Sequence, residues 1–186
     1  MIGNIDIFEN FLSAEECGFI LNKCKEELTL SDAKVYNNPN TLQTKTTRKS
    51  SIGWISDLEF LNKRLTNKLR ETFNINGMEV TGIGPFQFTE YKEGEYFDWH
   101  TDSNDTVYRD RFTSIVIQLN NEYTNGILEI KNLKGELVPI ENKIGTLYIF
   151  NSRLLHRVTP VTTGTRYSLV NWVSLVKTNL GKQNLI

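Results

Sequence analysis

A series of short β-type segments after Gly77 constrains the fold more than any other feature of the sequence. Runs rich in Val, Ile, Thr, Phe and Tyr alternate there with clusters of Gly, Asn and Asp, a pattern typical of consecutive antiparallel strands. Eight short strands in about a hundred residues favour a jelly roll made of two sheets. The predicted strands are Thr81–Tyr91, Tyr96–His100, Thr113–Leu119, Ile127–Ile130, Glu136–Ile140, Thr146–Phe150, Leu155–Val161 and Tyr167–Val173.

The N-terminal part carries two helical patterns. Ser13–Glu16 has the form of a capping box and opens the first helix, after a short strand over Ile5–Phe8. Apolar residues three and four positions apart predict a second helix over Leu58–Phe73. Between the helices, residues 32–47 are polar and are expected to be mostly loop, followed by a strand over Thr47–Ile55. The expected fold class is mainly β, with the helices packed on the outside of one sheet.

Length and charge limit the kind of protein. The chain has 186 residues, 39% of them hydrophobic, which allows one sizeable core and leaves little room for two. We expect a single domain over residues 1–186, with a helical support region at 1–76, a jelly-roll core at 77–176 and a tail at 177–186. The formal net charge of -1 argues against a nucleic-acid coat protein or a membrane-surface binder.

Three features predict a cytoplasmic protein. No stretch approaches the roughly 18 apolar residues that a membrane span requires. Residues Met1–Asp6 lack the basic and apolar pattern of a secretion signal. Cys17 and Cys24 lie seven positions apart on the first predicted helix, too far for an easy disulfide, and are interpreted as small core residues in a reducing compartment.

The candidate chemistry rests on the two histidines of the chain, His100 and His156. Side chains alternate across a strand, so His100 and Asp102 are expected to share one face. An imidazole and a carboxylate on one face supply two of the three ligands of a facial triad, which holds non-haem Fe(II) and leaves other positions open. The third ligand would be His156, although a His-x-Asp pattern also fits a polar surface strand.

Arg166 lies ten residues beyond His156, at the start of a hydrophobic strand. An arginine facing the interior there would be a buried, unpaired charge unless it met an anion, and its planar guanidinium suits a carboxylate. The alternative is an exposed arginine at the end of a strand.

Together these motifs resemble the Fe(II)- and 2-oxoglutarate-dependent dioxygenases, specifically the prolyl 4-hydroxylase-like group with its bacterial and phage relatives. The resemblance spans roughly Thr81–Leu175: a Tyr-x-x-Gly run leads to His-x-Asp, and a distal His is followed by Arg. It implies a double-stranded β-helix in which His100, Asp102 and His156 bind iron and Arg166 binds the distal carboxylate of 2-oxoglutarate.

The resemblance implies further contacts for three residues. Tyr91 matches a tyrosine that lines the co-substrate pocket of relatives, and Gln118 falls near a second polar contact to 2-oxoglutarate that is commonly a tyrosine. Trp172 is expected to share the inward face of its strand with Arg166. For Tyr91, Gln118 and Trp172, ordinary packing in the core is the alternative reading.

The implied reaction is hydroxylation of a substrate C–H bond. The enzyme would bind Fe(II), consume O2 and 2-oxoglutarate, and use L-ascorbate as reductant. No catalytic residue is expected beyond the metal and co-substrate ligands. Peptidyl proline is the first substrate class to consider, while free amino acids, other protein side chains and small metabolites remain open. The polar connection over 102–111 could form a lip over the site or an ordinary hairpin loop, and residues 37–48 could form another wall.

Two other function classes stay open. Nucleic-acid demethylases of the same superfamily usually carry a second arginine six residues after the first, where this chain has Trp172. A non-catalytic jelly-roll binding module would make both histidines structural.

The chain also departs from the motifs of these relatives at two places. It has Asn125–Leu128 where relatives have Gly-Gly-Glu-Leu, and it has Phe97 as the second aromatic residue of the first motif. Both differences are expected to alter the substrate pocket.

Overall fold

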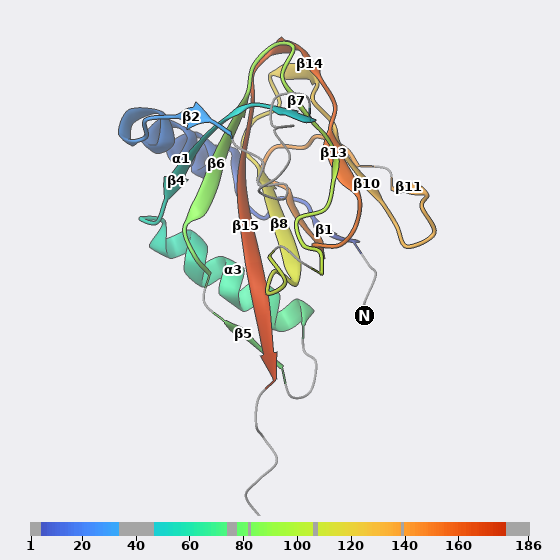
Figure 1. Cartoon of the computed structure of the whole chain (residues 1–186). Coiled ribbons are helices and arrows are strands. Elements are labelled where there is room, and N and C mark those ends of the chain that lie inside the picture. Colours follow the sequence, from blue (N-terminus) through green and yellow to red (C-terminus); the bar gives the residue numbers. More distant parts are fainter. Residues whose placement is uncertain are drawn as a thin grey trace, which may run out of the picture.

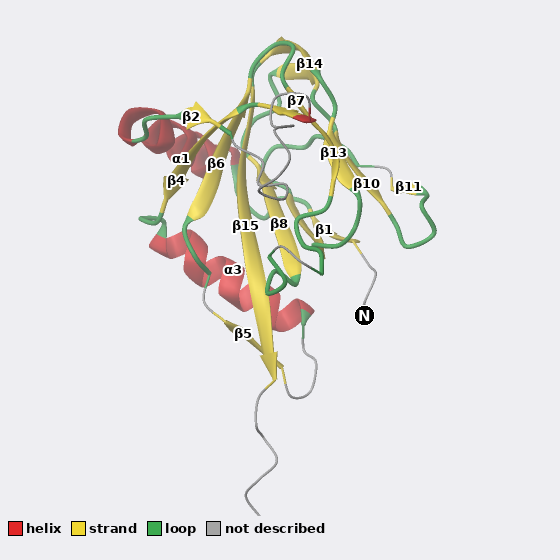
Figure 2. Ribbon diagram, viewed as in Figure 1, coloured by secondary structure: helices red, strands yellow, loops and turns green. Residues whose placement is uncertain are grey.

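Over the residues that it describes, the computed structural model contains two larger antiparallel sheets, a two-stranded ribbon and two helices (Figures 1 and 2). The model describes residues 5–33, 47–73, 78–81, 83–105, 108–138 and 140–177. The helices are α1 (Ala14–Glu27) and α3 (Glu59–Thr72). The strands are β1 (Ile5–Phe8), β2 (Ser31–Asp32), β3 (Arg48–Lys49), β4 (Ser51–Ile55), β5 (Met78–Thr81), β6 (Phe86–Tyr91), β7 (Tyr96–His100), β8 (Thr113–Gln118), β9 (Tyr123–Asn125), β10 (Leu128–Lys131), β11 (Leu137–Val138), β12 (Leu147–Asn151), β13 (His156–Val158), β14 (Val161–Gly164) and β15 (Arg166–Lys177).

The strand order explains how the two sheets face each other. The larger sheet runs β1-β12-β8-β15-β6-β4-β2, with β5 added to the far end of β15. The smaller sheet runs β11-β10-β13-β7-β3, and β14 pairs with β9. In Figure 1 the helices lie beside the larger sheet and the smaller sheet lies on its other side. The predicted jelly-roll architecture with helices on one sheet is confirmed.

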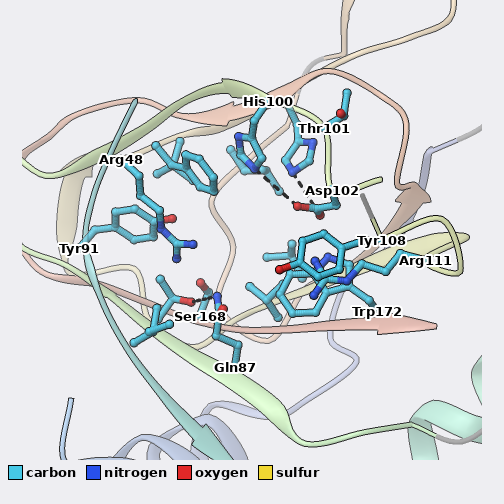
Figure 3. A pocket seen from close by; sticks show the side chains of 18 of the residues that line it. Arg48, Gln87, Tyr91, His100, Thr101, Asp102, Tyr108, Arg111, Ser168 and Trp172 are labelled. Atoms are coloured by element: carbon cyan, nitrogen blue, oxygen red, sulfur yellow. Dashed lines mark hydrogen bonds and ion pairs between the residues drawn. The ribbon is translucent and has the colours of Figure 1, made fainter. Parts of the chain in front are cut away.

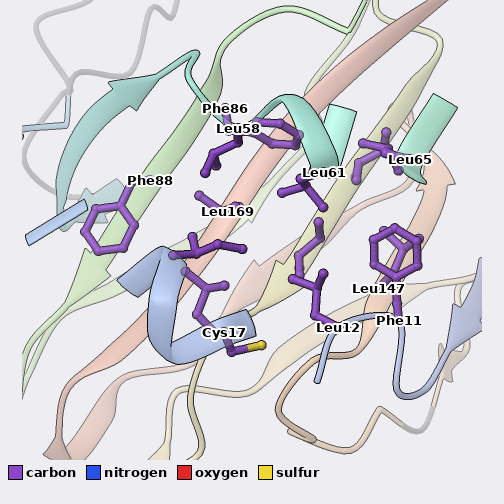
Figure 4. Close-up of a cluster of buried hydrophobic side chains, with 14 of the residues drawn as sticks. Phe11, Leu12, Cys17, Leu58, Leu61, Leu65, Phe86, Phe88, Leu147 and Leu169 are labelled. Atoms are coloured by element: carbon purple, nitrogen blue, oxygen red, sulfur yellow. The ribbon is translucent and has the colours of Figure 1, made fainter. Parts of the chain in front are cut away.

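The main core lies between the helices and the larger sheet (Figure 4). Leu61, Leu65 and Leu69 repeat every four residues along α3 and are fully buried, as the helical period requires. They pack with apolar residues of the larger sheet such as Phe86 and Leu169. A second cluster of buried apolar residues lies between the two sheets. The larger sheet is therefore covered on both faces, which fixes the inward face of each strand.

The start of α1 follows the predicted capping box. The Ser13 Oγ accepts from the Glu16 amide at 3.2 Å, and the Glu16 carboxylate accepts from the Ser13 amide at 2.9 Å. Glu16 also pairs with Arg64 of α3, with Oε1 and Nη2 2.6 Å apart. The same side chain thus caps one helix and links it to the other. Neither described helix is long and apolar enough to cross a membrane.

Several element boundaries differ from prediction. The segment predicted as one strand over Thr47–Ile55 divides at Ser50, so that β3 joins the smaller sheet and β4 the larger. The strand predicted over Leu155–Val161 ends at Val158, two residues before Pro160, which has no amide hydrogen for a ladder. The strand predicted from Thr81 starts at Phe86, directly after Pro85.

The three-residue strand β9 was not predicted, because it is too short to show a two-residue period. Most of the loop predicted over 32–47, including the proposed wall at 37–46, lies outside the described residues. The predicted tail lies outside them as well, apart from residue 177.

Candidate metal centre and anion site

Three potential metal ligands converge between the sheets. His100 ends β7 and His156 opens β13, and the antiparallel register sets these two residues opposite each other. Asp102 follows β7 on the same face as His100 (Figure 3). One ligand atom from each of the three residues lies within 4.8 Å of the others. The structure thus brings His100 and Asp102 to one face, as alternation along the strand predicted, and places His156, the other histidine of the chain, beside them.

Backbone carbonyls orient both imidazole rings. The Nδ1 atom of His100 lies 2.7 Å from the Asp98 carbonyl oxygen, and Nδ1 of His156 lies 2.9 Å from that of Leu154. Because a carbonyl only accepts, each Nδ1 carries the hydrogen and each Nε2 keeps its lone pair. The two Nε2 atoms lie 3.6 Å and 3.4 Å from the oxygens of the Asp102 carboxylate. Three electron-pair donors thus face one point, an arrangement that suits a cation.

Hydroxyl groups hold the Asp102 carboxylate from behind. Ser114 Oγ donates to Asp102 Oδ2 at 2.6 Å and lies 2.9 Å from the Ser152 hydroxyl. The amide of Asp102 donates to the Ser152 carbonyl oxygen at 2.8 Å. Ser114 and Ser152 are fully buried, so this network is protected from competing water. It fixes the direction in which the carboxylate points.

Electrostatics favour the metal-binding form of two of the three ligands, His100 and Asp102. Burial lowers the pKa of His100 to about 3, and the neighbouring His156 adds to the shift. Burial opposes charge on Asp102, but His156, His100 and the Ser114 hydroxyl hold the pKa of that carboxyl well below its usual range. For His156, burial is again the largest effect, yet Asp102 and the Leu154 carbonyl together outweigh it and raise the pKa. At neutral pH the site therefore holds an ionised carboxylate and a neutral His100.

Aromatic rings pack against both histidines. Phe97 stacks on His100 with ring centroids 3.4 Å apart and planes at 11°, and the Arg48 guanidinium lies 4.5 Å from the centre of the Phe97 ring. Phe150 meets the His156 ring edge-on at 4.9 Å. Phe97, which departs from the pattern of relatives, is therefore part of the wall beside the proposed metal ligands.

A cavity of about 590 Å³ extends from these ligands between the two sheets. Residues that alternate along β15 line it: Arg166, Ser168, Val170 and Trp172. Arg166 is only 1% exposed, and its Nη1 donates to the Ser168 hydroxyl at 3.2 Å. Its Nε and Nη2 atoms are buried with no hydrogen-bond partner, and no described carboxylate forms an ion pair with it. A buried guanidinium in this state is unfavourable until an anion reaches it.

The three other predicted contacts have different surroundings. Tyr91 lines the cavity, and its ring centre lies 5.5 Å from the Arg166 guanidinium carbon. Trp172 lines the cavity too, beside Tyr108 and Arg111 (Figure 3). Gln118 is buried, and its amide donates to the carbonyl oxygens of Asn120 and Tyr167. Both hydrogens of the Gln118 amide are thus used within the protein, which favours a structural role over the predicted contact.

Sequence reasoning missed a cation at the mouth of the cavity. The Arg111 guanidinium lies 3.7 Å from the centre of the Tyr108 ring and 3.9 Å from that of Trp172 (Figure 3). Arg111 and Tyr108 belong to the polar connection predicted as a lip, and both line the cavity. Only the position of this connection directly after Asp102 pointed to them, because loops show no period that reveals the direction of a side chain.

Comparison with known proteins agrees with this geometry. The sequence profile of the 2OG-Fe(II) oxygenase superfamily matches residues 86–174, which contain all three candidate metal ligands and Arg166. A PKHD-type hydroxylase of Shewanella oneidensis is 31% identical over 108 residues, covering 55% of this chain and 48% of that protein. A PKHD-type hydroxylase of Idiomarina loihiensis is 28% identical over 145 residues, covering 69% of this chain and 66% of that protein. The chain thus spans about half to two thirds of the length of these relatives.

Solved structures share the fold over nearly the whole chain. A Pseudomonas putida prolyl-4-hydroxylase has a TM-score of 0.71 and 23% identity, covering 92% of each chain. A Trichoplax adhaerens prolyl hydroxylase, solved with a peptide fragment of the oxygen degradation domain of hypoxia inducible factor, has a TM-score of 0.74 and 21% identity, covering 91% of this chain and 83% of that one. These structures show that the chain shares their fold, while the profile match and the PKHD-type relatives make its sequence similar to the 2OG-Fe(II) oxygenase superfamily over the segment that carries the convergent site.

Proposed function

We propose that the protein is an Fe(II)- and 2-oxoglutarate-dependent dioxygenase that hydroxylates a substrate C–H bond. The observation that carries this proposal is that one cavity contains two incomplete sites. His100, Asp102 and His156 point their electron pairs at one place, and no lysine or arginine among the described residues pairs with them there. The buried guanidinium of Arg166 has no carboxylate beside it among these residues. A divalent metal would complete the first site and a dicarboxylate the second, and both lie in one continuous space.

The residues fit these groups without rearrangement of their hydrogen bonds. His100 and His156 would bind Fe(II) through Nε2, because their Nδ1 atoms are held by carbonyls, and Asp102 would bind it through its carboxylate. Arg166 would bind the distal carboxylate of 2-oxoglutarate through Nε and Nη2. When bound, Fe(II) and 2-oxoglutarate supply the oxidation by O2, in which the substrate is hydroxylated and 2-oxoglutarate becomes succinate and carbon dioxide.

The chain's own contribution is orientation and exclusion of water. Ser114 fixes the carboxylate of Asp102, and Phe97 covers one face of His100. Apolar side chains such as Val116 and Val158 line the cavity between metal site and anion site. Because both histidines would bind the metal, no imidazole is left to act as a general acid or base. Placement of the reactants is therefore the protein's main role.

We further propose that the substrate is a proline residue in a peptide. The cavity mouth is aromatic: Trp54 is 51% exposed, Tyr108 is 41% exposed and Trp172 lies beside them. Such faces suit the rigid, apolar ring of proline. The two prolyl hydroxylase structures with the same fold, one of them solved with a peptide, support this class.

A free amino acid is the second candidate, because two arginines line the same cavity. Neither Arg48 nor Arg111 forms an ion pair with a carboxylate among the described residues. Each can therefore meet a peptide carbonyl or the free carboxylate of an amino acid.

We propose L-ascorbate as the external reductant and the cytoplasm as the location. The latter is supported by Cys17 and Cys24, which are buried and unpaired, as is usual in a reducing compartment.

Turnover assays with a substrate panel test the proposed function. Purified protein with Fe(II), ascorbate and 2-oxoglutarate is incubated with proline-containing peptides, the same peptides with alanine in place of proline, and free amino acids. We expect succinate formation that rises with the proline peptides and is lost in His156→Ala. A rise with free amino acids alone would transfer the proposal to the second candidate. No succinate from the wild type under any condition would contradict the enzyme assignment.

A further inference from the structure

Gln118 has no hydrogen left with which to bind a carboxylate. A side-chain amide carries two hydrogens on nitrogen, and its oxygen only accepts. Gln118 Nε2 lies 2.9 Å from the Asn120 carbonyl oxygen and 3.2 Å from that of Tyr167, so both hydrogens are in use. The remaining amide oxygen would repel an anion. Any second hydrogen bond to the anion at Arg166 has to come from another residue.

Tyr123, on the unpredicted strand β9, lies beside Arg166. The evidence is the shared contact of both side chains with Gly126: a Cβ atom placed there would lie 3.3 Å from Cδ of Arg166 and 3.3 Å from Cε2 of Tyr123. Gly126 has a positive φ of 58°, and it leaves the space in which these two side chains meet. The Tyr123 hydroxyl is buried and has no hydrogen-bond partner.

The phenol is a neutral donor at physiological pH. Burial raises the pKa of Tyr123, although the adjacent Arg166 and, to a smaller extent, Gln118 oppose the shift. The hydroxyl therefore keeps its hydrogen, and it lies next to a guanidinium that has two unused nitrogen atoms. A buried hydroxyl with no partner costs free energy, and a carboxylate with about four lone-pair sites can accept from both groups together.

We propose that Tyr123 is the second donor to the distal carboxylate of 2-oxoglutarate, in the place where resemblance pointed to Gln118. This inference rests on the proposed function, since it names a further residue of the same co-substrate site. In this arrangement Arg166 supplies the charge and Tyr123 supplies a directional O–H bond from the neighbouring β9–β14 ribbon. Gln118 has a structural role, tying β8 to the Tyr167 carbonyl of β15.

Direct binding measurements on Tyr123→Phe test the proposal. The variant keeps the ring and removes only the hydroxyl. Calorimetric titration of Mn(II)-loaded protein with 2-oxoglutarate gives an affinity that does not depend on turnover. Loss of a hydrogen bond to a charged group should weaken binding about ten- to a hundredfold. Binding of 2-oxopentanoate, which has a methyl group in place of the distal carboxylate, should be the same in both proteins.

Tyr148→Phe is the matched control. Tyr148 is also buried, but its hydroxyl already donates to the Glu141 carbonyl oxygen at 2.6 Å, so its removal should leave 2-oxoglutarate affinity within about twofold. Circular dichroism and Mn(II) affinity would verify that each variant is folded.

Four outcomes decide the proposal. Selective loss of 2-oxoglutarate affinity in Tyr123→Phe supports it. Unchanged affinity in that variant overturns it while the proposed function stands. Equal losses for 2-oxoglutarate and 2-oxopentanoate overturn it as well, because they indicate a packing effect. If wild-type protein binds no 2-oxoglutarate, the proposed function fails first and this inference fails with it.

Discussion

Replacing Arg166 by methionine should stabilise the metal-free and ligand-free protein while abolishing its response to 2-oxoglutarate. Arg166 is 1% exposed, and two of its three nitrogen atoms have no partner. Methionine keeps an unbranched side chain of similar length and removes the charge and the unsatisfied N–H groups. The protein thus carries a charge that is unfavourable for folding and useful for binding.

The magnitude follows from the burial of this charge. Replacing a buried ionic group by an apolar residue of similar size gains about 1–4 kcal/mol, and the hydrogen bond to Ser168 that is lost is worth about 1 kcal/mol. We therefore expect the free energy of unfolding to rise by up to about 3 kcal/mol, and the Tm by up to roughly 12 °C for a chain of this size. The ion pair of Arg157 with Glu129 is half-exposed, so Arg157→Met should change stability by less than about 1 kcal/mol.

Urea unfolding and thermal melts of wild type, Arg166→Met and Arg157→Met measure these differences. The same melts are repeated with metal-loaded protein and 2-oxoglutarate at about a hundred times its Kd. The ligand should raise the free energy of unfolding of the wild type by about 2.7 kcal/mol and leave that of Arg166→Met unchanged. A loss of about 3 kcal/mol or more in Arg166→Met would show that the guanidinium already has a compensating partner and is not an unpaired buried charge.

Three further predictions concern the support of the site and the core. Ser114→Ala should weaken Mn(II) binding about ten- to a hundredfold in a titration, because Asp102 loses its O–H donor; an unchanged affinity would remove Ser114 from the site. Leu65→Ala should lower the free energy of unfolding by about 2–5 kcal/mol in urea, and a loss below about 1 kcal/mol would contradict the core described above. The hydrogen bond from Arg64, followed by that from the Ser13 backbone, lowers the pKa of Glu16 to about 2. The stabilisation by Glu16 is therefore present above its ordinary pKa near 4.5 and is lost as the pH falls toward 2, so Glu16→Gln should be less stable than wild type at pH 7 and equally stable near pH 2, as judged by melts across that range.

The helices could be predicted because their sequence signals involve residues that are close together in the chain. The leucines of α3 repeat over three turns, and the capping box of Ser13 and Glu16 marks the start of α1, so both helices lie where expected. The division of 47–55 between two sheets could not be predicted, because strand pairing depends on distant partners: Arg48 pairs with Phe97 and Ile55 with Phe86.

The site, like the fold, could be predicted only in part. Alternation along one strand was enough to bring His100 and Asp102 to one face, and the scarcity of histidine pointed to His156. The surroundings of Gln118 depend on which carbonyls its amide meets across β15, and Tyr123 lies on a strand too short to detect. Sequence therefore identifies residues that share one element, while contacts between elements require the structure.

Anaerobic titration of the protein with Fe(II) in the presence of 2-oxoglutarate shows whether His100, Asp102, His156 and Arg166 form one site for iron and co-substrate. We expect a weak visible charge-transfer band from the iron–2-oxoglutarate chelate, saturating at one iron per chain. The band should be absent in His156→Ala, which lacks one of the three proposed ligands, and it should require far more 2-oxoglutarate in Arg166→Met. A wild-type protein that gives no band, or a band that persists unchanged in His156→Ala, would contradict the account.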